Sequence, residues 1–128
     1  MKFLPDTHML LWAAGEPGKL PAAAREIIAD TNNELFFSVI SIWEIAIKRS
    51  LGRSNFHADP HRMRHLLLAA GYRELPMTSD HALAILQLPP IHQDPFDRIL
   101  IAQATTESIT LLTADSEIAK YPGPIRTV

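Results

Sequence analysis

The sequence predicts an α/β domain with a central, mostly parallel sheet. Short apolar runs typical of buried strands alternate along the chain with longer segments of helical periodicity. Such alternation favours right-handed crossovers, which place helices on both faces of the sheet. A length of 128 residues with 47% hydrophobic residues suits one core, so we expect a single domain over residues 1–128.

The chain begins with a predicted strand followed by two helices. Residues 2–5 form a short extended run, and Asp6-Thr7 caps an apolar helix over residues 9–14. Residues 21–28 are typical of a second helix because a proline stands at the first position. An asparagine-containing turn then leads into the next strand.

The middle of the chain continues the alternation. Residues 35–39 are apolar enough for a buried strand, and a serine opens a helix over residues 41–51. A further helix is expected over residues 60–70 because proline is well placed at its start. Residues 73–77 are typical of a short edge strand, and a serine caps the helix that follows over residues 79–88.

The last third of the chain repeats the same order. Asp94 is predicted to cap a helix over residues 96–107, with proline at its first position. Residues 109–113 are typical of a buried strand, and Asp115 is placed to cap a short helix after it. Residues 125–128 complete the predicted sheet of about five strands.

The composition limits the function classes. Fourteen acidic and twelve basic residues give a net charge of -2, which is not the global basic field of a general nucleic-acid binder. The absence of cysteine excludes disulfides and thiolate chemistry. We expect a soluble, cytoplasmic protein with no membrane contact, because no apolar run approaches a signal peptide or a membrane span.

Four acidic residues stand where predicted strands give way to helices: Asp6, Glu44, Asp97 and Asp115. In parallel sheets these junctions meet at one crevice, so we expect the four side chains to lie close together. Each acid alone is better explained by a role at a helix start than by a site, and Glu44 could complete a capping box opened by Ser41. The set of four is harder to explain by capping than any one member.

Clustered carboxylates repel one another unless a cation joins them or some take up protons. A divalent metal would balance the charge, and ligands that are all hard oxygens favour Mg²⁺ or Mn²⁺ over Zn²⁺. Such a site indicates phosphate chemistry.

Two further groups of potential ligands are interpreted as structural. Asp94 is explained by its capping position before proline. His57, His61 and His65 recur every four residues, but Pro60 should leave His57 outside the helix, which disfavours a zinc site.

The four acids lie in four segments with a distinctive order and spacing: Asp6-Thr7-His8 with Trp12, Ser41 to Lys48 around Glu44, His92 to Gln103 with Asp94-Pro-Phe-Asp97, and Leu111 to Asp115. In order, spacing and total length these segments resemble PIN-domain toxins of the VapC type, over nearly the whole chain. The resemblance implies a PIN-like three-layer sandwich and a metal-dependent endoribonuclease. It also implies a VapB-like antitoxin, a homodimer, and a higher assembly of toxin with antitoxin.

The resemblance assigns Asp6, Glu44 and Asp97 as the core catalytic and metal-binding acids, with Asp115 as the fourth and more variable one. RNA phosphodiesters would then be hydrolysed by water activated by Mg²⁺ or Mn²⁺. Pro5 departs from the family pattern, because an aliphatic residue usually precedes the first acid. Its tolerance in a central strand predicts a strand end or a bulge, and a displaced Asp6 would weaken the metal site.

Positive charge concentrates between residues 48 and 73, where one acid, Asp59, faces six cations: Lys48, Arg49, Arg53, Arg62, Arg64 and Arg73. This basic stretch could contact RNA phosphates or the antitoxin, or it could be a solvated helical face with Lys48 in a surface ion pair with Glu44. His8 and Arg98 are further candidates for substrate contact because they adjoin the acidic motifs. Trp12 and Trp43 are interpreted as core or dimer contacts in preference to base stacking.

Three rival functions remain open from the sequence. One is a receiver-like phosphoacceptor domain in signalling, although no lysine follows the strand at residues 109–113 until Lys120. The second is a PIN-fold binding module that has lost catalysis, which the unusual Pro5 suggests. The third is a metal-dependent DNA nuclease or structure-specific nuclease that uses the same acids.

Overall fold

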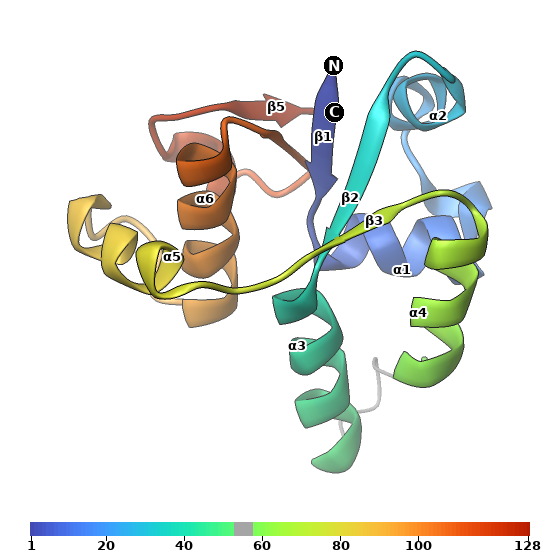
Figure 1. The fold of residues 1–128 in the computed structure, drawn as a ribbon, viewed down its shortest axis with the longest axis horizontal. Helices are drawn as coiled ribbons and strands as arrows, with labels where there is room; N and C mark the ends of the chain where they lie inside the picture. Colours follow the sequence, from blue (N-terminus) through green and yellow to red (C-terminus); the bar gives the residue numbers. More distant parts are fainter. Residues whose placement is uncertain (53–57) are drawn as a thin grey trace.

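The computed structural model describes residues 1–52 and 58–128, folded around one five-stranded sheet (Figure 1). The helices are α1 (Thr7–Gly15), α2 (Ala22–Ala29), α3 (Val39–Ser50), α4 (Pro60–Ala69), α5 (Ser79–Ala84) and α6 (Pro95–Glu107), with short 3-10 turns η1 (Pro17–Lys19), η2 (Ile85–Gln87) and η3 (Ile118–Lys120). The strands are β1 (Lys2–Pro5), β2 (Glu34–Ser38), β3 (Arg73–Leu75), β4 (Thr110–Thr113) and β5 (Ile125–Thr127). None of the described helices has the length and apolar character needed to cross a membrane.

The sheet has the order β3-β2-β1-β4-β5, and every neighbouring pair of strands is parallel. The predicted α/β class with about five strands is therefore confirmed. The chain runs from β1 outward to β3, then crosses back over β1 to reach β4, so connections leave the β1–β4 boundary in opposite directions. A crevice for ligands is expected at such a boundary, beyond the carboxyl ends of the strands. The receiver-like alternative is wrong, because that fold has the order 2-1-3-4-5.

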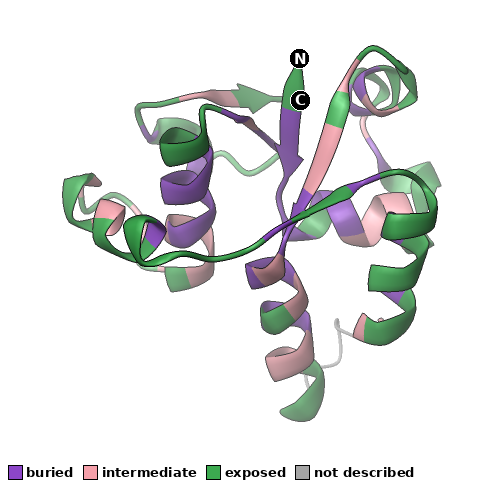
Figure 2. Cartoon of the chain, viewed as in Figure 1, coloured by how far each residue is buried: buried purple, intermediate pink, exposed green. Residues whose placement is uncertain are grey.

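Apolar side chains of successive strand residues pack on opposite faces of the sheet. Leu4 and Leu111 pack in a cluster with α6, whereas Phe3 and Leu112 pack in another with α1 and α2. Figure 1 shows α6 on one side of β1 and α1, α2 and α4 on the other. In Figure 2 most of β1 and the middle turns of α6 are buried. Helices on both faces make the three-layer sandwich that was predicted.

Pro5 is the last residue of β1 and pairs with Leu112 of β4, so the expected strand end is confirmed. Successive backbone N–H groups of a strand point to opposite neighbours. Asp6 donates its N–H to the carbonyl of Leu112 at 2.9 Å, so the missing donor of Pro5 falls on the β2 side. Pairing of β1 with β2 has already ended at Phe3, so the proline leaves no ladder position unfilled.

The residues that cap α3 and α5 differ from those predicted. Helix α3 begins at Val39, capped by Ser38, so the capping box opened by Ser41 is wrong. Glu44 lies in the second turn, too far along to cap the helix. Helix α5 is capped by Thr78, one residue before the serine that was expected to do so.

Candidate functional site

Asp6 and Asp115 follow β1 and β4, the two strands at which the connections change direction. A cavity of about 200 Å³ is lined by both side chains. The hydroxyl of Thr113, at the end of β4, joins the two: Oγ1 donates to Asp6 Oδ2 at 2.6 Å and accepts from the Asp115 N–H at 2.9 Å. The predicted meeting of these acids at the carboxyl edge is observed.

Asp6 is 5% exposed. It caps α1, because Oδ1 accepts from the Met9 N–H at 3.0 Å, so the capping role and the site position coexist in one side chain. Burial raises the pKa of Asp6, and the nearby charge of Asp115 raises it further, while its hydrogen bonds with Thr113 and Met9 lower it. Burial therefore makes ionisation of Asp6 less favourable than it is in water, and a bound cation would offset that cost.

Glu44 points inward from α3 and is 3% exposed. Thr7 Oγ1 donates to Oε1 at 2.7 Å, and Lys48 Nζ donates to Oε2 at 2.6 Å. The pair with Lys48 has the expected spacing of four residues, but it is not a surface pair, since the two side chains are 19% and 4% exposed. Thr7 directly follows Asp6 in the sequence, so its hydrogen bond connects Glu44 to the residue next to Asp6.

Asp97 lies in the first turn of α6, and its side chain is 16% exposed. Its Oδ2 lies 2.9 Å from His92 Nε2. Burial and the charge of Asp94, then the charges of Glu44 and Asp6, raise the pKa of Asp97 to about 7, against the lowering effect of the His92 hydrogen bond. Carboxylates from α3 and from the end of β1 therefore act on a third in α6, across three separate elements.

Asp115 differs from the other three acids because it is exposed. Its Oδ1 accepts from the Glu117 N–H at 2.8 Å, which makes a local turn before η3. The predicted helix after it is this 3-10 turn, with Glu117 at its N-terminal cap position.

Asp94 caps α6 as predicted, accepting from the N–H groups of Phe96 and Asp97. It also stands beside His92 and Asp97, and one ligand atom from each of the three lies within 4.8 Å of the others. Within residues 1–52 and 58–128 this is the one group of three or more metal-ligating side chains so closely spaced. The donor set here is two carboxylates and one imidazole, with Glu44 and Asp6 near enough to influence Asp97.

The sequence pattern of the PIN domain family matches residues 3–124. The chain belongs to the PIN domain family. Solved structures with this fold include VapBC2 from Rickettsia felis bound to a DNA fragment from the promoter, with 16% identity, a TM-score of 0.72, and coverage of 100% of this chain and 99% of that one. DNA-bound VapBC from Salmonella typhimurium is similar at 18% identity, TM-score 0.66, covering 99% and 98% of the two chains. A toxin-antitoxin complex from Klebsiella pneumoniae is similar at 17% identity, TM-score 0.64, covering 97% and 95%. A search of curated protein sequences finds no match.

The basic stretch does not act as one free patch in this PIN domain. Three of its basic side chains form ion pairs with carboxylates from outside the stretch: Lys48 with Glu44, Arg64 with Glu74 and Arg73 with Glu34. The stretch therefore carries less uncompensated charge than its sequence indicates. Arg49 belongs to the end of α3, and Arg53 and His57 lie outside the described residues.

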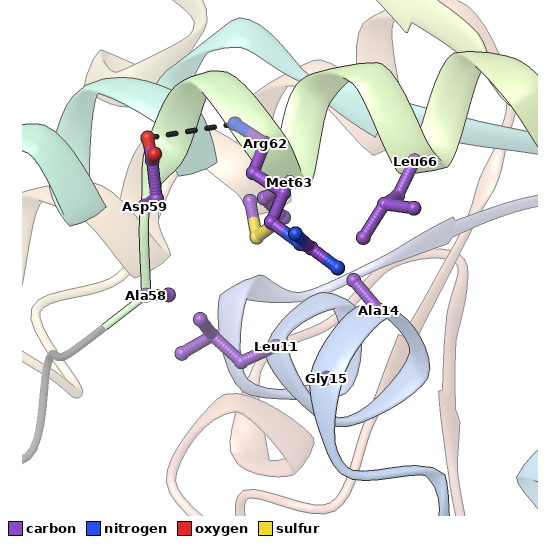
Figure 3. A pocket seen from close by; sticks show the side chains of 8 residues that line it. All are labelled: Leu11, Ala14, Gly15, Ala58, Asp59, Arg62, Met63 and Leu66. Atoms are coloured by element: carbon purple, nitrogen blue, oxygen red, sulfur yellow. Dashed lines mark hydrogen bonds between the residues drawn. The ribbon is translucent and has the colours of Figure 1, made fainter.

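Arg62 borders a second cavity, of about 130 Å³, between α1 and α4 (Figure 3). Its side chain extends across the cavity toward Ala14 and Leu66, and the other walls are largely apolar. The acids of the PIN site do not line this cavity. Arg62 is thus placed by packing against α1, and not by the acidic site.

Arg98 follows Asp97 but its Nη1 points to the loop before α6. It donates to the Pro89 carbonyl at 3.1 Å and to the Tyr121 hydroxyl oxygen at 3.2 Å. The same hydroxyl accepts from the His92 N–H at 2.7 Å. Through these contacts Arg98 holds the loop that carries His92.

Two threonines of the site were missed from the sequence, Thr7 and Thr113, although both lie in the quoted motifs. Each donates a hydrogen bond to a buried carboxylate of a different strand or helix. The available signal was position, because each stands at a strand end beside an acid. Position alone does not say which carboxylate a hydroxyl will contact.

Proposed function

We propose that this PIN domain is a VapC-type toxin, a metal-dependent endoribonuclease acting in the cytoplasm and restrained by a VapB-like antitoxin. The observation that carries the proposal is the gathering of acids at the carboxyl edge of the sheet, where Asp6 and Asp115 line one cavity and the charges of Glu44 and Asp6 act on Asp97 of α6. A structural helix cap gains nothing from such repulsion, whereas a cation site requires several carboxylates in one place.

The donor chemistry fits Mg²⁺ or Mn²⁺. Asp6, Glu44 and Asp97 would hold the metal with hard carboxylate oxygens, and Asp115 would complete the set from the exposed side. When bound, the metal supplies activation of water for attack and stabilisation of charge on the phosphate. In the absence of a cation, burial and mutual repulsion favour protonation of Asp6 and Asp97.

The chain's own residues fix the acids in place. Thr113 holds one oxygen of Asp6, and Thr7 and Lys48 hold the two oxygens of Glu44. His92 orients Asp97 in the same manner. Such supporting hydrogen bonds commonly change metal affinity or activity by about 10 to 100-fold when they are removed.

The proposed homodimer is supported by apolar side chains on the surface of α5 and η2. Leu83 is 63% exposed and Leu86 is 80% exposed, and Trp43 of α3 is 55% exposed. Figure 2 shows the exposed character of the α5 region. Burial of such side chains in a symmetric interface would stabilise a dimer. Sedimentation of the parent protein and of Leu86→Lys would test this, because a dimer through this face predicts a shift toward monomer.

The proposed activity is tested by metal binding and cleavage together. Calorimetry with Mg²⁺ and Mn²⁺ should show weakened binding in Asp6→Asn, Glu44→Gln and Asp97→Asn relative to the parent protein. Parent protein should cut single-stranded RNA in either metal and should lose this activity in EDTA. Metal binding without cleavage would favour an impaired binding module, and cleavage of DNA in place of RNA would favour a DNA nuclease. Unchanged metal binding in all three variants would locate the site elsewhere.

A further inference from the structure

The cavity shared by Asp6 and Asp115 has an aromatic wall. His8 and Trp12 of α1 line it together with the two acids and Ala114. The site acids thus form one side of the cavity, and rings from the first two turns of α1 form another. A ligand with a phosphate at the acids and its metal would extend a neighbouring group into this space.

The two rings are arranged to hold a flat group without filling the cavity themselves. They lie four residues apart on one helix, with centroids 6.1 Å apart and planes tilted by 53°. Because the planes are tilted, the rings do not stack on each other. Trp12 is half-buried and packs against the core cluster that contains Phe3 and Met9, which fixes the indole in place.

The size of the cavity favours one planar ring. Its volume of about 200 Å³ lies below the range of about 300 to 1,000 Å³ typical for sites that take drug-sized ligands. A complete nucleotide is larger than one ring, but its phosphate and sugar would lie outside this space, toward the acids. A single nucleobase therefore matches the size of this open cavity.

The negative charge at this edge of the sheet makes stacking on a base more useful for RNA binding than contacts with phosphate. Asp6 and Asp115 line the cavity, and their charges repel phosphate unless a cation is present. Aromatic stacking on a nucleobase does not depend on phosphate charge and tolerates any base. A chain with a net charge of -2 has little other general attraction for a nucleic acid.

We infer that the cavity of His8, Trp12 and Asp115 is a nucleobase subsite, in which the base next to the scissile phosphate stacks on Trp12. The inference rests on the proposed nuclease function and deepens it by naming a single-stranded, unpaired base as the group recognised. Trp12 is then a substrate-binding residue, and its interpretation from the sequence as a core or dimer contact is incomplete. His8 forms the outer edge of the same subsite.

Fluorescence tests the contact without removing Trp12. The chain has two tryptophans, so Trp43→Phe leaves Trp12 as the single indole emitter. Every proposed metal ligand is kept, and emission is recorded in the first seconds after mixing, before cleavage proceeds. A ten-nucleotide single-stranded RNA in Mg²⁺ should quench Trp12 emission, whereas an abasic ribose-phosphate oligomer of equal length should bind more weakly and leave the emission unchanged.

Kinetics test the contribution of the ring in the otherwise unaltered protein. Trp12→Leu should raise KM about tenfold with kcat nearly unchanged, because stacking contributes equally to substrate and transition-state binding. Trp12→Phe should restore most of the loss, since it retains an aromatic face. Trp43→Leu is the matched control, and it should leave KM unchanged because Trp43 contacts Phe96 outside the cavity.

Equal quenching by the RNA and by the abasic oligomer would overturn the inference, as would a KM effect in Trp43→Leu that is absent from Trp12→Leu. Loss of folding in Trp12→Leu would leave the fluorescence titration to decide, since Trp12 is intact there. Cleavage of RNA by the parent protein with unchanged Trp12 emission would overturn the subsite alone. Absence of RNA cleavage by the parent protein would overturn the proposed function and the subsite together.

Discussion

The acids at the carboxyl edge of the sheet and the arginines of α4 hold their charges in opposite ways. Asp6, Glu44 and Asp97 are drawn from different elements, removed largely from water and placed near one another. Arg64 extends from the outside of α4 and meets Glu74 as an exposed pair, with side chains 52% and 36% exposed. The sheet edge gathers negative charges in a buried place, whereas α4 pairs a positive charge with a negative one at the surface.

This difference helps to distinguish charged residues that have a function from those that only pair at the surface. An exposed ion pair contributes little free energy and demands little of the fold. Buried carboxylates with raised pKa values destabilise the metal-free protein, so their retention requires another reason. Binding of a cation supplies that reason at the acidic edge, and nothing comparable is required on α4.

The largest expected effect separates activity from stability at Asp97. Asp97→Asn should lower RNA cleavage more than about 100-fold, because it removes a proposed ligand and supporting contacts alone are worth about 10 to 100-fold. The same variant should melt at least as high as the parent protein in EDTA at pH 8, because repulsion is relieved. Thermal melts in EDTA and Mg²⁺ beside cleavage assays measure both. A lower melt in EDTA with normal cleavage would assign Asp97 to helix capping.

The pH dependence of the same melts follows from the sign of the shift. The folded protein keeps a proton on Asp97 up to about pH 7, whereas the unfolded chain releases it near pH 4. Stability of the metal-free parent protein should therefore fall as pH rises from about 4 to about 7. Burial raises the pKa of Asp6 too, which acts in the same direction. Asp97→Asn should flatten this slope, and Mg²⁺ should restore the stability of the parent protein near pH 8.

The buried Lys48–Glu44 pair and the exposed Arg64–Glu74 pair should respond differently when the basic side chain is removed. Lys48→Met leaves buried Glu44 without its 2.6 Å partner and should destabilise the metal-free protein by about 2 to 3 kcal/mol at pH 8. Arg64→Met removes an exposed partner and should change stability by less than about 1 kcal/mol. Urea unfolding in EDTA measures both variants. Equal losses would show that burial does not distinguish the pairs.

A smaller effect is expected for the hydroxyl that supports Asp6. Thr113→Val removes the 2.6 Å hydrogen bond and should lower kcat/KM and Mg²⁺ affinity about tenfold. Thr113→Ser should recover most of both, because it keeps the hydroxyl. Thr105→Val is the matched control, since that hydroxyl contacts the Ile101 carbonyl within α6. A tenfold loss in the control would point to a general effect on packing.

The order of strands and helices was predictable because each segment carries its own periodicity and cap. Asp94-Pro95 fixed the start of α6 correctly, since proline suits the first helical position. The start of α3 was not predictable in the same way, because Ser38 and Ser41 are both acceptable caps; in the fold Ser38 caps the helix, and Ser41 accepts a hydrogen bond from Thr7. The order of strands depends on which apolar faces meet across the sheet, and periodicity does not encode that.

The acids of the candidate site were predictable because parallel strands bring their carboxyl ends to one edge. Their supporting contacts were not, since Thr113 and Asp6 are 107 residues apart in sequence. The ion pairs of the basic stretch were not predictable for a related reason. Glu34 and Glu74 lie outside the window that was counted, yet they pair with Arg73 and Arg64 in the fold.

The smallest expected effect concerns RNA binding by α4. Neutralising Arg62 and Arg64 to glutamine should change the slope of log affinity against log salt by less than about 0.7, the amount for one phosphate on a single strand. The reason is that Arg64 already pairs with Glu74, and Arg62 lies along an apolar cavity away from the acids. Binding of a ten-nucleotide RNA from 50 to 200 mM salt, in the Asp97→Asn background, measures the slope. A decrease of about 1.4 or more would make both arginines phosphate contacts and would remove the contrast between the two regions. An unchanged slope with weakened antitoxin binding would assign them to the antitoxin surface, where acidic side chains of the partner would compete with Glu74.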